Sequence, residues 1–124
     1  MQIDHINIRA PMDLLQKARD FYCDVLGLTE GFRPNISGHG FWIYAGDKPI
    51  IHLSESADRA RTGKPGFFDH FALRASEPAT IIEKLDKAGI EYVVKSVDEI
   101  NLTQVFCKDP AGIGVELNFL DQPG

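Results

Sequence analysis

Two short stretches decide the fold of this chain: residues 5–10 read HINIRA, and residues 70–75 read HFALRA. They match at an offset of 65 residues. Two more matches follow in order, LGL at 26–28 with AGI at 88–90, and IHL at 51–53 with VEL at 115–117, at offsets of 62 and 64. Ordered matches at a nearly constant spacing indicate an internal duplication. We therefore expect two related halves.

The sequence pattern of each half predicts a strand, a helix and three further strands, in that order. In the first half, alternation over residues 3–9 predicts a strand that ends at Pro11, and an apolar stripe over 12–26 predicts a helix that ends at Gly27. In the second half, Ser76 is the expected cap of a helix that ends at Gly89. The remaining predicted strands cover residues 28–34, 40–46, 49–53, 67–74, 90–97, 102–109 and 112–119. The expected class is α+β, with two βαβββ modules and curved mixed sheets.

The length of the chain limits how independent the halves can be. Each half of the 124 residues is about 62 residues long, a size that buries little surface by itself. We therefore expect one domain over 1–124, with module one at 1–58, a polar linker at 54–66 and module two at 65–124.

Composition excludes several functions. The net charge is −5 and the basic residues form no stripe, so nucleic acid is not an expected partner. No apolar run is long enough to cross a membrane, and residues 1–10 lack the apolar stretch of a signal peptide. Cys23 and Cys107 stand alone, as small core residues of a protein in a reducing compartment. The expected location is the cytoplasm.

The repeat also aligns three of the histidines and one glutamate in pairs. It aligns His5 with His70 in the first strand of each half, and His52 with Glu116 in the last strand. The apolar neighbours of each residue point to the opposite face, so all four polar groups share the face that two curved sheets could enclose. Three imidazoles and one carboxylate suit a divalent Zn, Ni, Co, Mn or Fe ion.

Other residues are assigned by the same alternation. His39 is expected to be a solvated loop residue, and the favoured interpretation of Trp42 and Tyr44 is that they belong to the core. The linker charges Arg59, Arg61 and Lys64 are best explained as solvated. The residues expected to line a substrate pocket beside the metal ligands are Asn7, Arg74, Gln104, Phe106 and Asn118.

The chain resembles the vicinal oxygen chelate superfamily, which includes glyoxalase I, extradiol dioxygenases, fosfomycin-resistance proteins and bleomycin-resistance proteins. The resemblance rests on the repeat, on RDFYCDVLGL at residues 19–28, and on TQVFCKDPAGIGVELNF at residues 103–119. It covers nearly the whole chain. The resemblance implies that His5, His70 and Glu116 match family metal ligands, whereas His52 stands where glyoxalase I has a second glutamate.

The resemblance implies a metal-dependent glyoxalase-like lyase or isomerase. Its metal would chelate two adjacent substrate oxygens and stabilise an enediolate or oxyanion, with Glu116 as the carboxylate able to move the proton. His52 is either a fourth ligand or a group beside the substrate. A dioxygenase, a thiol transferase with a thiol cosubstrate and a metal-free binding protein stay open. The resemblance also implies a homodimer, with His5 and His52 from one chain and His70 and Glu116 from the other.

Overall fold

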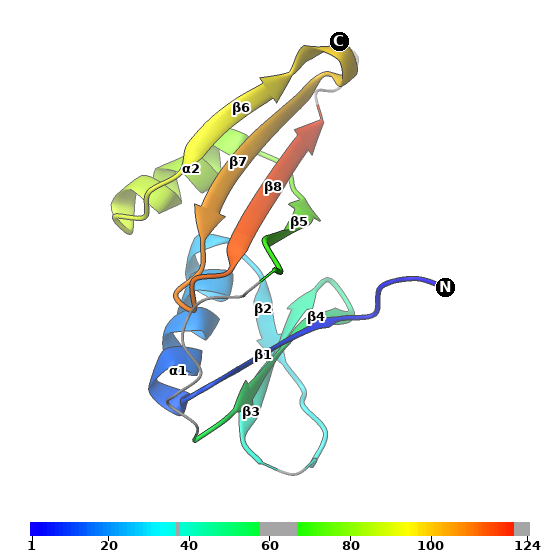
Figure 1. Cartoon of the computed structure of the whole chain (residues 1–124), viewed down its shortest axis with the longest axis vertical. Helices are drawn as coiled ribbons and strands as arrows, with labels where there is room; N and C mark the ends of the chain where they lie inside the picture. The colour runs from blue at the N-terminus through cyan, green and yellow to red at the C-terminus, as the bar shows by residue number, and fades with distance from the viewer. Residues whose placement is uncertain (37, 58–66, 121–124) are drawn as a thin grey trace. The chain divides into compact units, whose positions relative to one another are not determined.

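The computed structural model describes residues 1–36, 38–57 and 67–120. The chain divides into two compact units, Met1–Thr62 and Gly63–Gly124. Each unit has a strand, a helix and three more strands, in that order along the chain (Figure 1). No helix among the described residues is long and apolar enough to cross a membrane.

The first unit begins with β1 (Ile6–Ala10). Pro11 follows this strand directly and precedes α1 (Met12–Asp20). A π-helical turn (Phe21–Val25) continues α1, and Gly27 then takes a φ of 79° that side chains other than glycine disfavour. Three strands follow: β2 (Thr29–Gly31), β3 (Gly40–Ala45) and β4 (Lys48–Glu55).

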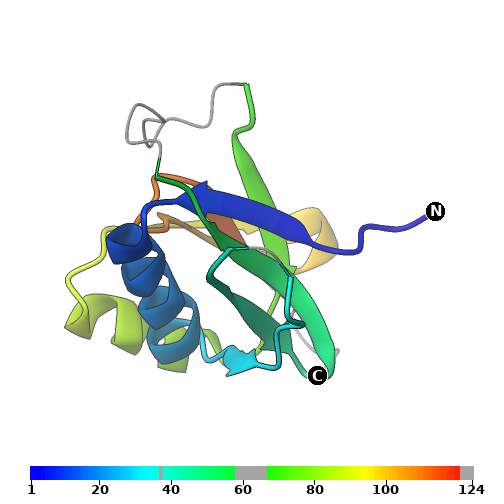
Figure 2. The same cartoon turned by 90° about the horizontal axis from the view of Figure 1, so that it is seen from below.

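The four strands of the first unit form one sheet in the order β1-β4-β3-β2, in which β1 and β4 are parallel. α1 lies against one face of this sheet (Figure 2). On that face Ile43, Ile51 and Leu53 are fully buried, together with Leu15 of the helix. The period of two along β4 turns His52 to the opposite face, away from α1.

The second unit repeats this plan. It contains β5 (His70–Arg74), α2 (Pro78–Lys87), β6 (Val93–Val97), a 3-10 turn (Asp98–Ile100), β7 (Leu102–Lys108) and β8 (Gly114–Leu120). The sheet order is β5-β8-β7-β6, and β5 and β8 are parallel. Its core contains Val105, Val115 and Leu117, with Leu85 of α2.

The expected fold is confirmed: each unit is a βαβββ module with a mixed four-stranded sheet. The prediction that Ser76 caps the second helix is wrong. The residue before α2 is Glu77, which has a left-handed φ of 58° and makes no side-chain cap, and the helix begins at Pro78. Proline at the first helical position has its φ already set and lacks an N–H that would need a partner there. The first strand also begins later than expected, at Ile6.

Candidate functional site

Each unit orients one histidine at the start of its first strand. The Nδ1 atom of His5 lies 2.6 Å from Oδ2 of Asp4, and the Nδ1 atom of His70 lies 2.7 Å from Oδ2 of Asp69. An ionised carboxylate can only accept, so each Nδ1 carries the proton and donates it. Such a carboxylate–histidine pair fixes the ring and leaves Nε2 as the nitrogen for another partner, the arrangement that metal-binding histidines commonly have.

The second unit places a carboxylate beside its oriented histidine. His70 Nε2 lies 3.2 Å from Oε1 of Glu116, whose residue is 8% exposed. β5 pairs with β8 so that Ala72 lies opposite Glu116, and His70 is two residues earlier on the same face. The hydrogen bond from His70 to Asp69, with the nearby Glu116 charge, raises the pKa of His70. The protonated form of His70 is therefore stabilised beside these two carboxylates.

The first unit has an aromatic stack at the equivalent place. The rings of His5 and His52 lie 3.8 Å apart and 12° from parallel, and the indole of Trp42 lies 3.9 Å from His52 on its other side. The register explains the contact with Trp42, which lies directly opposite His52 on β3. His52 is thus held between two rings.

His52 has a defined tautomer in this stack. Its Nε2 lies 3.1 Å from the carbonyl oxygen of Pro49, which can only accept, so Nε2 carries the proton. Burial lowers the pKa of His52, and electrostatic repulsion from His5 lowers it further. The neutral ring therefore has its lone pair on Nδ1, and Nδ1 is the atom through which His52 could bind a metal.

The predicted ligands thus form two pairs, His5 with His52 and His70 with Glu116. Within the described ranges, no three His, Cys, Asp or Glu side chains gather closely enough to hold an ion. The donor set nevertheless fits a divalent cation: two histidines have their Nδ1 atoms held by carboxylates, and Glu116 is a buried carboxylate next to a histidine nitrogen. Each unit therefore contains one pair of potential metal donors.

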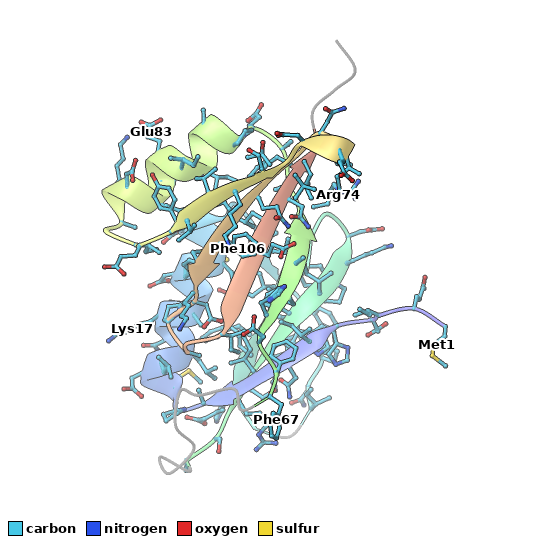
Figure 3. The ribbon with its side chains drawn as sticks, turned by 45° about the horizontal axis from the view of Figure 1, so that its top comes forward. Met1, Lys17, Phe67, Arg74, Glu83 and Phe106 are labelled. Carbon is cyan, nitrogen blue, oxygen red and sulfur yellow. The ribbon has the colours of Figure 1, made fainter. Side chains whose placement is uncertain are left out.

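A cavity of about 1050 Å³ opens in the second unit beside His70. Phe106 forms part of its wall and meets the His70 ring edge-to-face, with the centroids 6.3 Å apart. Figure 3 labels Phe106 on β7 and Arg74 at the end of β5. Tyr92, Val93 and Lys108 also line the cavity. This volume is large enough for a small organic molecule.

The predicted lining residues lie on the same faces as the ligands. Phe106 pairs directly with Glu116, and Gln104 pairs with Asn118, to whose Oδ1 its Nε2 donates at 3.4 Å. Arg74 lies opposite Asn118 on β5. In the first unit, Asn7 lies opposite His52 and accepts a hydrogen bond from Ser54.

Several expectations about other residues change. Trp42 is half-buried and stacks on His52, so it belongs to the site face and not to the core as favoured above. Tyr44 is also half-buried, and its hydroxyl donates to the carbonyl of Phe32 at 2.6 Å. His39 is exposed, as expected. The linker residues Arg59, Arg61 and Lys64 lie outside the described residues.

Sequence reasoning missed the partners of the oriented histidines. Asp4 and Asp69 precede His5 and His70, and the repeated Asp-His dipeptide was the signal that could have identified them. It also missed Tyr92 and Lys108, because a cavity at the end of a sheet depends on how loops and strand ends meet. No spacing rule in the sequence marks such residues.

Comparisons with known proteins agree with this architecture. A curated protein of Arabidopsis thaliana named Glyoxylase I 4 is 27% identical over 110 residues, which are 83% of this chain and 63% of that protein. The chain therefore spans less than two thirds of the length of that relative.

Two solved structures share the fold. A glyoxalase family protein from Bacillus anthracis has a TM-score of 0.76 and 23% identity, with 98% of this chain and 96% of that chain covered. TnmS3, an antibiotic-binding protein from Streptomyces sp. CB03234, has a TM-score of 0.68 and 21% identity, with 98% and 99% covered. The family model described as Glyoxalase/Bleomycin resistance protein/Dioxygenase superfamily matches residues 2–117. The chain belongs to this superfamily.

Proposed function

We propose that this protein is a divalent-metal-dependent lyase or isomerase of the glyoxalase type. It would bind the ion through His5, His52, His70 and Glu116 and act on a small substrate that has two adjacent oxygens. The observation that carries the proposal is the repeated pair: in each unit, a histidine oriented by the preceding aspartate lies beside a second donor on the last strand. Zn, Ni, Co, Mn and Fe are the candidate ions.

A divalent ion, when bound, supplies a Lewis acid that stabilises the enediolate or oxyanion charge on the two substrate oxygens. The residues of the chain supply the rest. Asp4 and Asp69 accept the Nδ1 protons of His5 and His70, which would leave the Nε2 atoms as the nitrogens that hold the ion. His52 is neutral at physiological pH, as a ligand must be, because burial lowers its pKa.

Glu116 is the residue proposed to move the proton. Its carboxylate is buried and lies 3.2 Å from His70 Nε2, so it has a fixed position on the site face. It would take a proton from one substrate carbon and return it to the neighbouring carbon. A positioned general base of this kind contributes about 10² to 10⁴ in rate. Asn7, Arg74, Gln104, Phe106 and Asn118 would line the substrate.

The test combines metal content with turnover. The purified protein, the variants His5→Ala, His52→Ala and Glu116→Gln, and the control His39→Ala are each loaded with metal and analysed for their metal content. His39 is an exposed loop histidine of the first unit, so His39→Ala should keep the metal. Turnover is measured with the hemithioacetal of methylglyoxal and glutathione.

We expect one ion per site in the wild type and in His39→Ala, with loss of metal in the three ligand variants. Retention of metal in His52→Ala alone would reduce the ligand set to His5, His70 and Glu116. A wild type that binds no divalent metal would contradict the proposal. Oxygen uptake with a catechol, or thiol addition to an epoxide, would instead identify the dioxygenase or thiol transferase reaction.

One observation favours a second function, metal-free binding of a flat ligand. The Trp42–His52–His5 stack is an aromatic platform, and the Nε2 atom of His52 is already engaged by Pro49. Platforms of this kind bind planar rings by stacking. Under this function, Trp42→Ala would weaken binding of a planar ligand to the metal-free protein, and adding a divalent metal would leave that binding unchanged.

A cytoplasmic homodimer is part of the proposal, with the His5–His52 pair and the His70–Glu116 pair of each site coming from different chains. Mixing unfolded His5→Ala and Glu116→Gln variants and refolding them together would then restore activity, because one of the two sites in a mixed dimer is intact. If each site came from one chain, the mixture would stay as inactive as its components.

A further inference from the structure

The guanidinium of Arg33, in the loop between β2 and β3, is poorly partnered. Its Nη1 donates to the carbonyl of Gly38 at 3.4 Å, near the outer limit of a hydrogen bond. Its Nε is buried and has no hydrogen-bond partner among the described residues. Buried polar groups are normally hydrogen-bonded, so this unpaired N–H is a donor that an acceptor outside the described residues could satisfy.

Another arginine of the same unit has carboxylate partners. The Nε atom of Arg19, on α1, lies 3.3 Å from Oδ1 of Asp20 and 3.8 Å from Oε1 of Glu30, and the guanidinium lies over the ring of Phe41 at 4.6 Å. In the part of the chain that the structure describes, no carboxylate forms an ion pair with Arg33. The positive charge of Arg33 is therefore available to a ligand.

The register of β2 bears on the face to which Arg33 belongs. Gly31, the last residue of β2, lies opposite Trp42, which lies opposite His52. Arg33 precedes Pro34, and a residue before proline favours extended conformations. Continued from β2 in extended chain, the alternation would put Arg33 on the same side as Gly31 and Trp42.

One further observation supports this placement. The hydroxyl of Tyr44 donates to the carbonyl of Phe32 at 2.6 Å, which ties the start of the loop to β3. The loop that carries Arg33 is thus tied to the strand that carries Trp42.

We propose that Arg33 binds an oxyanion of the substrate, a carboxylate or a phosphate, beside the Trp42–His52–His5 stack. The inference rests on the proposed function in one respect: the anion belongs to the substrate of that site. The planar guanidinium presents paired N–H donors that match a carboxylate or phosphate, and the unpaired Nε is one of those donors. Arg33 is thus a substrate-positioning residue that selects anionic substrates.

The test uses direct binding to metal-free protein, so it does not depend on turnover. Trp42 is the one tryptophan of the sequence, and its fluorescence reports on the stack. Metal-free wild type, Arg33→Gln, Arg33→Lys and Lys17→Gln are titrated with benzoate, phenyl phosphate and neutral benzamide at constant ionic strength. Calorimetry gives the same dissociation constants if the fluorescence does not respond. Lys17→Gln removes the same charge from an exposed position on α1.

We expect the wild type and Lys17→Gln to bind at least one of the two anions more tightly than benzamide. Arg33→Gln should weaken the binding of that anion by about tenfold or more, and Arg33→Lys should recover part of the lost affinity. Preference for benzoate assigns a carboxylate, and preference for phenyl phosphate assigns a phosphate. Equal binding by Arg33→Gln and wild type, or binding of benzamide as tight as that of the anions, would overturn the inference.

The outcome is separable from that of the proposed function. Anion binding that depends on Arg33, in a protein that takes up no divalent metal, would retain Arg33 as an anion-binding residue and reject the metal-dependent reaction. Metal uptake without Arg33-dependent anion binding would retain the metal-dependent reaction and reject Arg33 as an anion-binding residue.

Discussion

His70 Nε2 lies 3.2 Å from Oε1 of Glu116, while its Nδ1 lies 2.7 Å from Asp69. The ring is therefore held between two carboxylates. The hydrogen bond to Asp69 and the charge of Glu116 both favour the imidazolium form, which is why the pKa of His70 is raised. His52, held between two rings, has a lowered pKa because burial disfavours its charged form.

The two histidines should therefore titrate in a fixed order in metal-free protein. As the pH rises, His52 loses its proton before His70, because the pKa of His52 is lowered from the usual histidine value and the pKa of His70 is raised from it. Histidine NMR resonances followed against pH measure both values. Asp69→Asn should move the pKa of His70 down, with that of His52 unchanged. Coincident titration of the two rings would contradict the assignment.

Replacing Gly114 with alanine should disturb the start of β5. A Cβ at this position would lie 2.5 Å from the carbonyl oxygen of Asp69 and 2.8 Å from Cβ of His70, so the strand that carries the oriented histidine would have to move. Overpacking of this kind costs about 1–3 kcal/mol. Urea unfolding measures the loss, and Ala72→Ser, at an exposed position of β5, should stay within about 0.5 kcal/mol of wild type. An unchanged stability would show that β5 can adapt.

Asp109 should stabilise the turn between β7 and β8 through its side chain. It is 4% exposed, and its Oδ1 accepts from the backbone N–H of Ala111 at 2.8 Å and of Ile113 at 3.0 Å. Asp109→Ala removes both acceptors and should lower the free energy of unfolding by about 1–3 kcal/mol. Asp109→Asn keeps an oxygen there and should lose less. Thermal or urea unfolding compares the two, and an equal loss in both would argue against the two hydrogen bonds.

Cys107 should be unreactive in the folded protein. Burial, followed by the charge of Asp109, raises the pKa of its thiol to about 11, so at pH 8 only about one molecule in a thousand carries a thiolate. Mass spectrometry after iodoacetamide treatment should find Cys107 unmodified until denaturant is added. Cys23, which is only partly buried, serves as the internal comparison and should be modified sooner. Rapid labelling of Cys107 without denaturant would mean that β7 opens readily.

The sequence predicted the parts of the fold that depend on local pattern. Alternation around Ile51 and Leu53 placed His52 on the face away from the core, and the repeat related His5 to His70 before any contact was known. The register of the parallel strands agrees, because Ile6 lies opposite Ile51 and Phe71 lies opposite Val115. The alternation along each strand and the internal repeat therefore predicted which side chains share a face of each sheet and the order of the strands along the chain.

The features that were missed depend on side-chain chemistry in three dimensions. The size of the Trp42 indole suggested the core, but its position beside buried Ile43 turns it to the opposite face. Ser76 has good capping chemistry, yet the left-handed Glu77 and the following proline start the helix without it. Arg33 lies in a loop where no period applies, and only the absence of a partner for its Nε marks it.

The parallel pairing of the first and last strands has a consequence for biosynthesis. Ile6 and Ile51 are 45 positions apart, and Phe71 and Val115 are 44 apart, so each pairing closes almost a whole unit. Closing such long loops comes late in folding, because the entropy cost precedes the contacts that repay it. A donor pair therefore forms only once the final strand of its unit has been synthesised and docked. A nascent chain on the ribosome would carry separate histidines, so under the proposed function ion binding would have to wait for completion of the fold.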